Sequence, residues 1–161
     1  MRGMRKPVVK VGLALVAVLL LLAWRHGGAR LTPEQEVQAL VRQFIDNVER
    51  NHVADAGRLL APQYHWDHIP KSDFVRGMLM VEREYDRLMV SLDDTPRVIF
   101  DDESCQAGTV VVRCAVSGWR KGAVTTVGAD RAVEVRARVE RIHGHYKFTE
   151  AHGGGRFENE L

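Results

Sequence analysis

Two histidines, an aspartate and two large aromatic residues crowd into APQYHWDHIP, residues 61–70. Imidazole and carboxylate groups this close together in a sequence are typical of metal sites and of proton-transfer sites. A metal ion needs ligands that converge on one point. Because prolines near both ends disfavour a helix, we expect an extended strand, in which His65 and His68 project to opposite sides. The stretch therefore predicts no metal site.

Strand geometry divides this stretch into two faces, with Tyr64, Trp66 and His68 on one face and His65 and Asp67 on the other. Two interpretations stay open. In the first, the aromatic face lines a pocket, and His68 is a candidate catalytic group. In the second, that face packs into the core, and the imidazoles lie in water at its rim.

A second candidate group lies in HYKFTEAH, residues 145–152, which alternates like a strand. Tyr146 and Phe148 share a face with Glu150 and His152, so a core position for the two aromatic residues turns the other two inward. A carboxylate in apolar surroundings has a raised pKa suited to proton transfer, and a neighbouring imidazole orients it. The alternative is that the strand frays before the three glycines that follow, which leaves both groups in water.

Other chemistry has no support in the sequence, which contains no glycine-rich phosphate loop, G-x-S-x-G elbow, H-E-x-x-H motif or C-x-x-C pair. We predict no metal and no cofactor. Cys105 and Cys114 are expected to stay separate thiols, because a hairpin turn around residue 107 places Cys114 opposite residues near position 100. Three further aromatic residues either line a pocket or pack in the core: Tyr85, Trp119 and Tyr146.

The first half of the chain has helical periodicity. The sequence TPEQ, residues 32–35, combines an N-cap threonine, a first-turn proline and a glutamine that closes a capping box. An apolar stripe about four turns long follows it. A shorter helix is predicted up to Pro62, and a third helix is predicted with Ser72 as its cap. Gly77 within that third helix costs about 1 kcal/mol relative to alanine.

From Met89 onwards the apolar period changes from about 3.6 residues to about 2. Strands are predicted at residues 89–100, interrupted at Pro96, then at residues 109–119, 131–141 and 145–152. Helices followed by strands predict an α+β fold. In it, three helices pack on one face of a curved antiparallel sheet of about four to six strands.

This order of elements resembles the nuclear-transport-factor-2-like superfamily, whose cystatin-like cone also houses ketosteroid-isomerase-like and polyketide-cyclase-like proteins. The resemblance covers about residues 33–152 and rests on PEQEVQALVRQFIDNVERN, AGRLLAPQYHWDH and ERIHGHYKF. It implies a cone with an apolar pocket and a dimer through the outer face of the sheet. In enzymes of the superfamily a pocket carboxylate or histidine does acid–base work, whereas other members are binding or assembly modules. No residue here is carried over as the family's base.

Charge separates the N-terminus from the rest of the chain. Of 23 basic residues, five lie in residues 1–29, which hold no acidic residue. The remaining 18 basic residues face 21 acidic ones, so residues 30–161 carry a net charge of −3. A nucleic-acid-binding surface is therefore not expected.

The N-terminal basic cluster precedes VGLALVAVLLLLAW, an uncharged run from Val11 to Trp24. As a helix this run is about 21 Å long, and counting from Pro7 gives about 27 Å, against a hydrocarbon core of about 30 Å. Positive charge is heavier before the run than after it, which predicts a cytoplasmic N-terminus and an exported body. The alternative is a signal peptide cleaved at the small residues 27–29.

Three parts are thus predicted: residues 1–29 as a membrane anchor or signal peptide, residues 30–152 as a nuclear-transport-factor-2-like domain, and residues 153–161 as a flexible tail. The predicted location is the cell membrane, crossed once by residues 7–24, with the domain outside; the alternative is secretion after cleavage. We expect a non-catalytic, membrane-tethered binding or assembly module that takes a small apolar ligand. The competing prediction is a small-molecule isomerase, cyclase or dehydratase with Glu150 as base beside His152 or His68.

Overall fold

The structure is a computed structural model that describes residues 31–127 and 132–153. The predicted apolar helix and membrane anchor lie outside the described residues, as does the predicted tail from residue 154 onwards. Within the described ranges, no helix has both the length and the apolar character needed to cross a membrane.

Three helices come first in the described chain. The helix α2 spans Pro33–Glu49, α3 spans Val53–Arg58 and α4 spans Lys71–Glu84. The capping box predicted for α2 is confirmed, because the Gln35 amide donates to the Thr32 hydroxyl at 3.3 Å and the Thr32 amide donates to the Gln35 side chain at 2.9 Å. The cap predicted for α4 is wrong: Pro70 occupies the N-cap, and no side chain caps this helix.

Within residues 31–127 and 132–153, eight strands form one sheet in the order β2-β1-β8-β7-β5-β3, with β4 and β6 also paired to β5. Neighbouring strands are antiparallel except for β1 and β8, which run parallel. The strands are β1 (Leu60–Trp66), β2 (Ile69–Pro70), β3 (Arg87–Leu92), β4 (Arg97–Phe100), β5 (Ala107–Arg120), β6 (Ala123–Thr126), β7 (Val133–Ile142) and β8 (His145–Gly153).

The α+β class is confirmed, but the prediction of about four to six antiparallel strands is corrected in two respects. The strand count is higher for three reasons: the stretch at residues 60–70 pairs as β1 and β2, Pro96 separates β3 from β4, and β6, which the sequence analysis does not predict, pairs with β5. The sheet is also mixed. After α3 the chain lays β1 alongside the final strand in the same direction, which produces the one parallel pair among the described strands.

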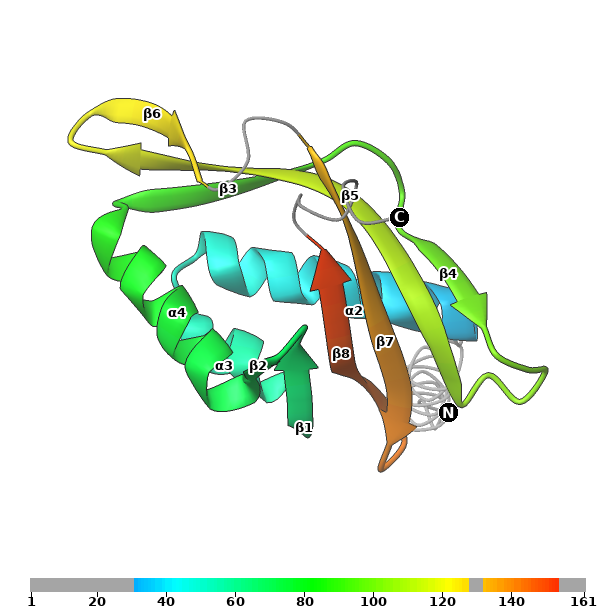
Figure 1. Ribbon diagram of the computed structural model, residues 1–161. Coiled ribbons are helices and arrows are strands. Elements are labelled where there is room, and N and C mark those ends of the chain that lie inside the picture. The colour runs from blue at the N-terminus through cyan, green and yellow to red at the C-terminus, as the bar shows by residue number, and fades with distance from the viewer. Residues whose placement is uncertain (1–30, 128–131, 154–161) are drawn as a thin grey trace, which may run out of the picture. The chain divides into compact units, whose positions relative to one another are not determined.

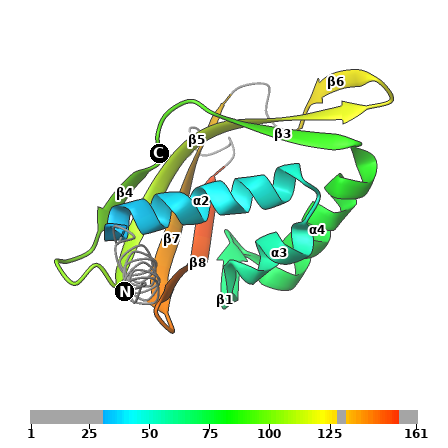
Figure 2. The ribbon, with the colours of Figure 1, turned by 180° about the vertical axis from the view of Figure 1, so that it is seen from behind.

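The long strand β5 organises the sheet. Its first half pairs with β4 and β7, and its second half pairs with β3 and β6. The sheet curls around α2, which lies along its concave face (Figures 1 and 2). The apolar stripe of α2 packs there, with Val37 and Val41 against Val110, Val139 and Phe148 in one core. Burying each such side chain contributes about 1.5–3 kcal/mol to the free energy of folding.

Candidate functional site

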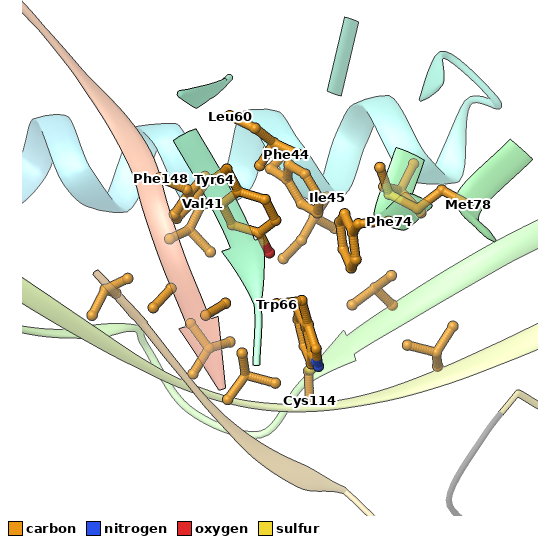
Figure 3. A pocket seen from close by; sticks show the side chains of 18 residues that line it. Val41, Phe44, Ile45, Leu60, Tyr64, Trp66, Phe74, Met78, Cys114 and Phe148 are labelled. Atoms are coloured by element: carbon orange, nitrogen blue, oxygen red, sulfur yellow. The ribbon is translucent and has the colours of Figure 1, made fainter. Parts of the chain in front are cut away.

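An apolar cavity of about 230 Å³ lies between the concave face of the sheet and the helices α2 and α4 (Figure 3). The helix α2 lines it with Val41, Phe44, Ile45 and Val48 because its apolar residues recur at helical spacing on one face. Alternation along β5 brings Val110, Val112, Cys114 and Val116 to the opposite wall, as the sequence predicts for that face.

Aromatic rings form one side of the cavity. The Trp66 ring stacks on Phe74 with ring centroids 5.4 Å apart and an interplanar angle of 8°. The Tyr64 ring lies 5.3 Å from Phe74 at a tilt of 57°. Tyr64 and Trp66 come from alternate positions of β1, and Phe74 comes from the first turn of α4. The cavity is therefore shaped for a ligand that presents an apolar, flat surface.

Very few polar groups reach the cavity. Tyr64 is only 4% exposed, and its hydroxyl points into the cavity (Figure 3). Burial raises the pKa of this hydroxyl and the Asp67 carboxylate raises it further, so the group stays protonated. Burial likewise raises the pKa of the Cys114 thiol, with a smaller contribution from Asp93. Among the described residues, the cavity is lined by no carboxylate and no imidazole.

The expectation that Glu150 and His152 face inward is wrong, and a β-bulge is the reason. Phe148 pairs with Val139 and Glu150 pairs with Arg138, which leaves Thr149 as an extra residue in β8. An extra residue reverses the alternation of side chains beyond it. Phe148 and Ala151 therefore both line the cavity, whereas Glu150 and His152 lie on the other side of the sheet.

On that outer side, His152 lies between two carboxylates. Its Nδ1 is 2.8 Å from an Asp67 carboxylate oxygen, and its Nε2 is 2.5 Å from a Glu150 carboxylate oxygen. The hydrogen bond to Asp67, followed by that to Glu150, raises the pKa of His152. Each carboxylate contacts a different nitrogen of the imidazole ring, so the two do not converge on one point where a metal ion could lie. No group of described residues could hold a metal ion.

The other predicted site residues lie outside the cavity. His68 is exposed in the turn between β1 and β2, because the strand ends at Trp66. The Tyr85 ring lies directly against Gly118, and Trp119 is 40% exposed. Tyr146 is buried in the core, where its hydroxyl donates to the Cys105 carbonyl oxygen.

Both cysteines are free thiols, and only Cys114 lines the cavity. Cys114 pairs with Leu92 rather than with a residue near position 100, because β5 is long enough to pass β4 and reach β3. Phe74 and Met78 also line the cavity, and the sequence analysis does not predict either as a pocket residue. Their spacing of four residues on one helix face carries that signal, but the same spacing is equally typical of core residues.

Several solved structures resemble this fold at low sequence identity. One from Novosphingobium aromaticivorans, provisionally described as a scytalone dehydratase, shares 7% identity over 73% of this chain and 79% of its own, with a TM-score of 0.62. A nuclear-transport-factor-2-like superfamily protein from Salmonella enterica serovar Typhimurium shares 10% identity over 80% and 94%, with a TM-score of 0.62. A protein of unknown function with a cystatin-like fold from Nostoc punctiforme shares 12% identity over 76% and 90%, with a TM-score of 0.57.

The chain therefore has the fold of the nuclear-transport-factor-2-like superfamily, as the sequence resemblance predicts. No protein-family model and no curated protein matches the sequence. At these identities the likeness extends to the fold alone, so the function must be argued from the site.

Proposed function

We propose that the domain binds a small apolar molecule in its cavity and does not catalyse a reaction on it. The observation that carries this proposal is the cavity lining, in which no described residue offers a carboxylate or an imidazole. Proton transfer needs a titratable group within hydrogen-bond reach of the substrate. The two titratable groups in the lining, the Tyr64 hydroxyl and the Cys114 thiol, both have raised pKa values and keep their protons near neutral pH, so neither accepts a proton from a substrate. The remaining walls are hydrocarbon and supply affinity by removing apolar surface from water.

The cavity volume sets the size of the ligand. A cavity of about 150 Å³ holds benzene, so the 230 Å³ found here corresponds to about nine carbon atoms. Indane, a flat bicyclic hydrocarbon, has that size and is a suitable probe. The full-length chain is best studied in lipid nanodiscs, because detergent would compete for an apolar cavity, and empty nanodiscs correct for indane dissolved in lipid.

Filling the cavity tests the proposal. Ala137 lines the cavity from β7, so Ala137→Leu should occupy part of it and weaken indane binding at least about tenfold, as measured by titration calorimetry. Ala123→Leu makes the same chemical change at an exposed position of β6 and should leave the affinity unchanged. Wild-type affinity in a folded Ala137→Leu variant would contradict a ligand site in this cavity.

A second candidate is a small-molecule isomerase, cyclase or dehydratase, favoured by the similar structure that is provisionally described as a dehydratase. Its proton transfers would fall to Glu150 and His152, which hydrogen bond to each other, or to His68. These groups lie outside the cavity, so the reaction would occur on the outer side of the sheet. A dehydration or isomerisation activity lost in Glu150→Gln and kept in Ala137→Leu would establish this candidate over the first.

For the location, we propose that residues 7–24 tether the domain to the outer side of the cell membrane. Support comes from the apolar run between Val11 and Trp24 and from the basic residues before it. Secretion after cleavage is the competing proposal. A homodimer through the outer face of the sheet stays a prediction, consistent with the exposure of Trp119 (40%) and its cross-strand neighbour Val124 (51%).

A further inference from the structure

His152, on the outer side of the sheet, is held at both nitrogens of its ring. Its Nδ1 lies 2.8 Å from an Asp67 carboxylate oxygen, and its Nε2 lies 2.5 Å from a Glu150 carboxylate oxygen. A neutral imidazole has only one N–H, so it can donate to one of these carboxylates and must turn a lone pair towards the other. Both contacts are therefore favourable only when the ring is protonated.

The surroundings of His152 favour that protonated state. Two carboxylates, two guanidinium groups and one imidazole surround the ring: Asp67 from the turn after β1, Glu150 from β8, Arg136 and Arg138 from β7, and His65 from β1. Both guanidinium groups also form ion pairs with other carboxylates, and the His65 ring lies 6.5 Å away between centroids. The hydrogen bonds to the two carboxylates prevail, first the one to Asp67, and they raise the pKa of His152.

The contact with Asp67 connects this charge to the wall of the cavity. Asp67 directly follows Trp66, whose ring lines the cavity and stacks on Phe74 of α4 (Figure 3). From Asp67 the chain runs through β2 straight into α4. The Asp67 backbone has a φ of 50°, in the left-handed region that a residue other than glycine keeps only when its surroundings hold it there. A contact that fixes this turn therefore also fixes Trp66 and the start of α4.

The helix α4 is lightly held against the rest of the domain. It has no buried residue, and no side chain caps its N-terminus. Its Phe74 ring packs on Tyr64 and Trp66 of β1, and its Lys71 ammonium donates to the Leu60 carbonyl oxygen at 2.7 Å. Segments with little buried surface open at a lower free-energy cost than the core does. This part of the cavity wall can therefore be biased by one contact at the surface.

We propose that protonated His152 holds the turn at Asp67, and with it the wall formed by Trp66 and Phe74, closed over the cavity, so that the domain binds its apolar ligand more tightly in acidic than in alkaline solution. When His152 loses its proton, one of its two contacts becomes repulsive, and the turn and α4 are released. This inference rests on the proposed function, since it adds proton control to the same cavity. By linkage, a ligand in the cavity also raises the pKa of His152.

The affinity for indane at two pH values tests the inference. Indane carries no charge, and the Tyr64 and Cys114 groups in the lining keep their protons in this range, so the cavity itself adds no pH dependence. The wild type should bind indane about two- to fivefold more tightly at about pH 5.5 than at about pH 8.5, the range expected for ion pairs at a half-exposed imidazole. The measurement is calorimetry on the full-length chain in nanodiscs.

Two variants separate His152 from other titrating groups. His152→Gln keeps a hydrogen-bonding side chain without a charge, and Asp67→Asn removes the charge of the turn while tolerating the same left-handed backbone. Each variant should bind indane with one affinity at both pH values. His145→Gln is the matched control, because it makes the same change at an exposed histidine of the same strand, and it should keep the pH dependence of the wild type.

Fluorine NMR gives a readout that needs no ligand. In protein made with 5-fluorotryptophan, the Trp66 signal is assigned by its loss in Trp66→Phe. The response of this signal to exchange of H₂O for D₂O reports solvent exposure of the ring. Exposure of Trp66 should rise between the acidic and the alkaline sample in the wild type, and it should not change with pH in His152→Gln.

The outcomes separate this inference from the proposed function. If indane binds with one affinity at both pH values and the Trp66 signal does not change, proton control is refuted while apolar binding stands. A pH dependence that persists in His152→Gln also refutes it, because another group then causes the effect. If indane binds at neither pH, the proposed function fails, and proton control of binding fails with it. A pH dependence found in the wild type and His145→Gln, and absent from His152→Gln and Asp67→Asn, supports both.

Discussion

His152 joins two separate segments through its two ring nitrogens. Asp67 comes from the turn after β1 and Glu150 from β8 itself, so a protonated imidazole ties the turn to the strand. Arg136 and Arg138 are the cross-strand neighbours of His152 and Glu150 on β7. Half of the His152 side chain is exposed, so solvent screens these ion pairs, and their contribution is about 0.5–1 kcal/mol.

The pKa of His152 is raised above its ordinary 6.5, first by the hydrogen bond to Asp67. A raised pKa means that the stabilisation is complete below the unfolded-state pKa and is lost as pH rises through the folded-state pKa. The wild type should therefore exceed His152→Gln in stability more at about pH 5.5 than at about pH 8.5. Urea unfolding at both pH values measures this difference. An equal gap at the two pH values would show that His152 is not coupled to the carboxylates.

At the scale of single residues, strand alternation predicts the inner positions of Tyr64 and Trp66 but not those of the last strand. Alternation on β1 holds as far as Trp66, so both aromatic residues reach the cavity. On β8 it fails at Thr149, which forms the bulge although no glycine or proline marks the position. A bulge of this kind depends on the partner strand, so the sequence of β8 alone carries no signal for it.

Gly77 and Gly118 differ in the space available for a side chain, so alanine at the two positions should change the stability of the protein in opposite directions. A Cβ atom built at Gly77 in α4 meets nothing within 4 Å, so Gly77→Ala should stabilise the protein by about 0.5–1 kcal/mol through helix propensity. A Cβ atom at Gly118 in β5 would lie 2.3 Å from the Tyr85 ring. Gly118→Ala should therefore destabilise by about 1–3 kcal/mol, as expected for overpacking.

Thermal unfolding of the two variants beside the wild type measures both changes. The expected result is a higher midpoint for Gly77→Ala and a lower one for Gly118→Ala. A Gly77→Ala variant less stable than the wild type would mean that α4 requires backbone freedom at its centre.

The elements differ in how far local sequence determines them. The helix α2 is predictable because its start depends on adjacent residues, and Thr32 and Gln35 hydrogen bond as their spacing predicts. The strand β1 is predictable only in part, because Pro62 indicates a helix end and thereby assigns Leu60, the first residue of the strand, to the preceding helix. Pro62 falls within the irregular part of the β1–β8 pairing, between Leu60 and His65, where its missing N–H breaks no regular ladder.

For the whole molecule, the fold follows from the order of helices and strands along the chain, whereas the proposed function follows from which side chains point into the cavity. Helices followed by alternating strands are enough to predict the α+β class, and the cone brings α2, α4, β1 and β5 around one cavity. The chemistry of that cavity depends on which side chains point inward over the whole sheet. The bulge in β8 and the turn after Trp66 determine which of these side chains point inward, and local sequence does not predict either feature.

The proposed membrane tether depends on the length of the apolar run near the N-terminus. Val11 to Trp24 alone is too short for the hydrocarbon core, so a stable span must extend back to Pro7, with the Lys10 ammonium reaching the headgroups.

We expect the protein to remain in the membrane fraction after alkaline carbonate washing, with the intact mass of 18.2 kDa that retains residues 1–29. Replacing Leu15 by Arg should release the uncleaved chain from the membrane, because a charge at the centre of a marginal span costs about 2.5–3.5 kcal/mol. The same leucine-to-arginine change at exposed Leu79 in α4 is the control and should leave the chain bound. A wild-type mass that lacks residues 1–29 would instead establish secretion after cleavage.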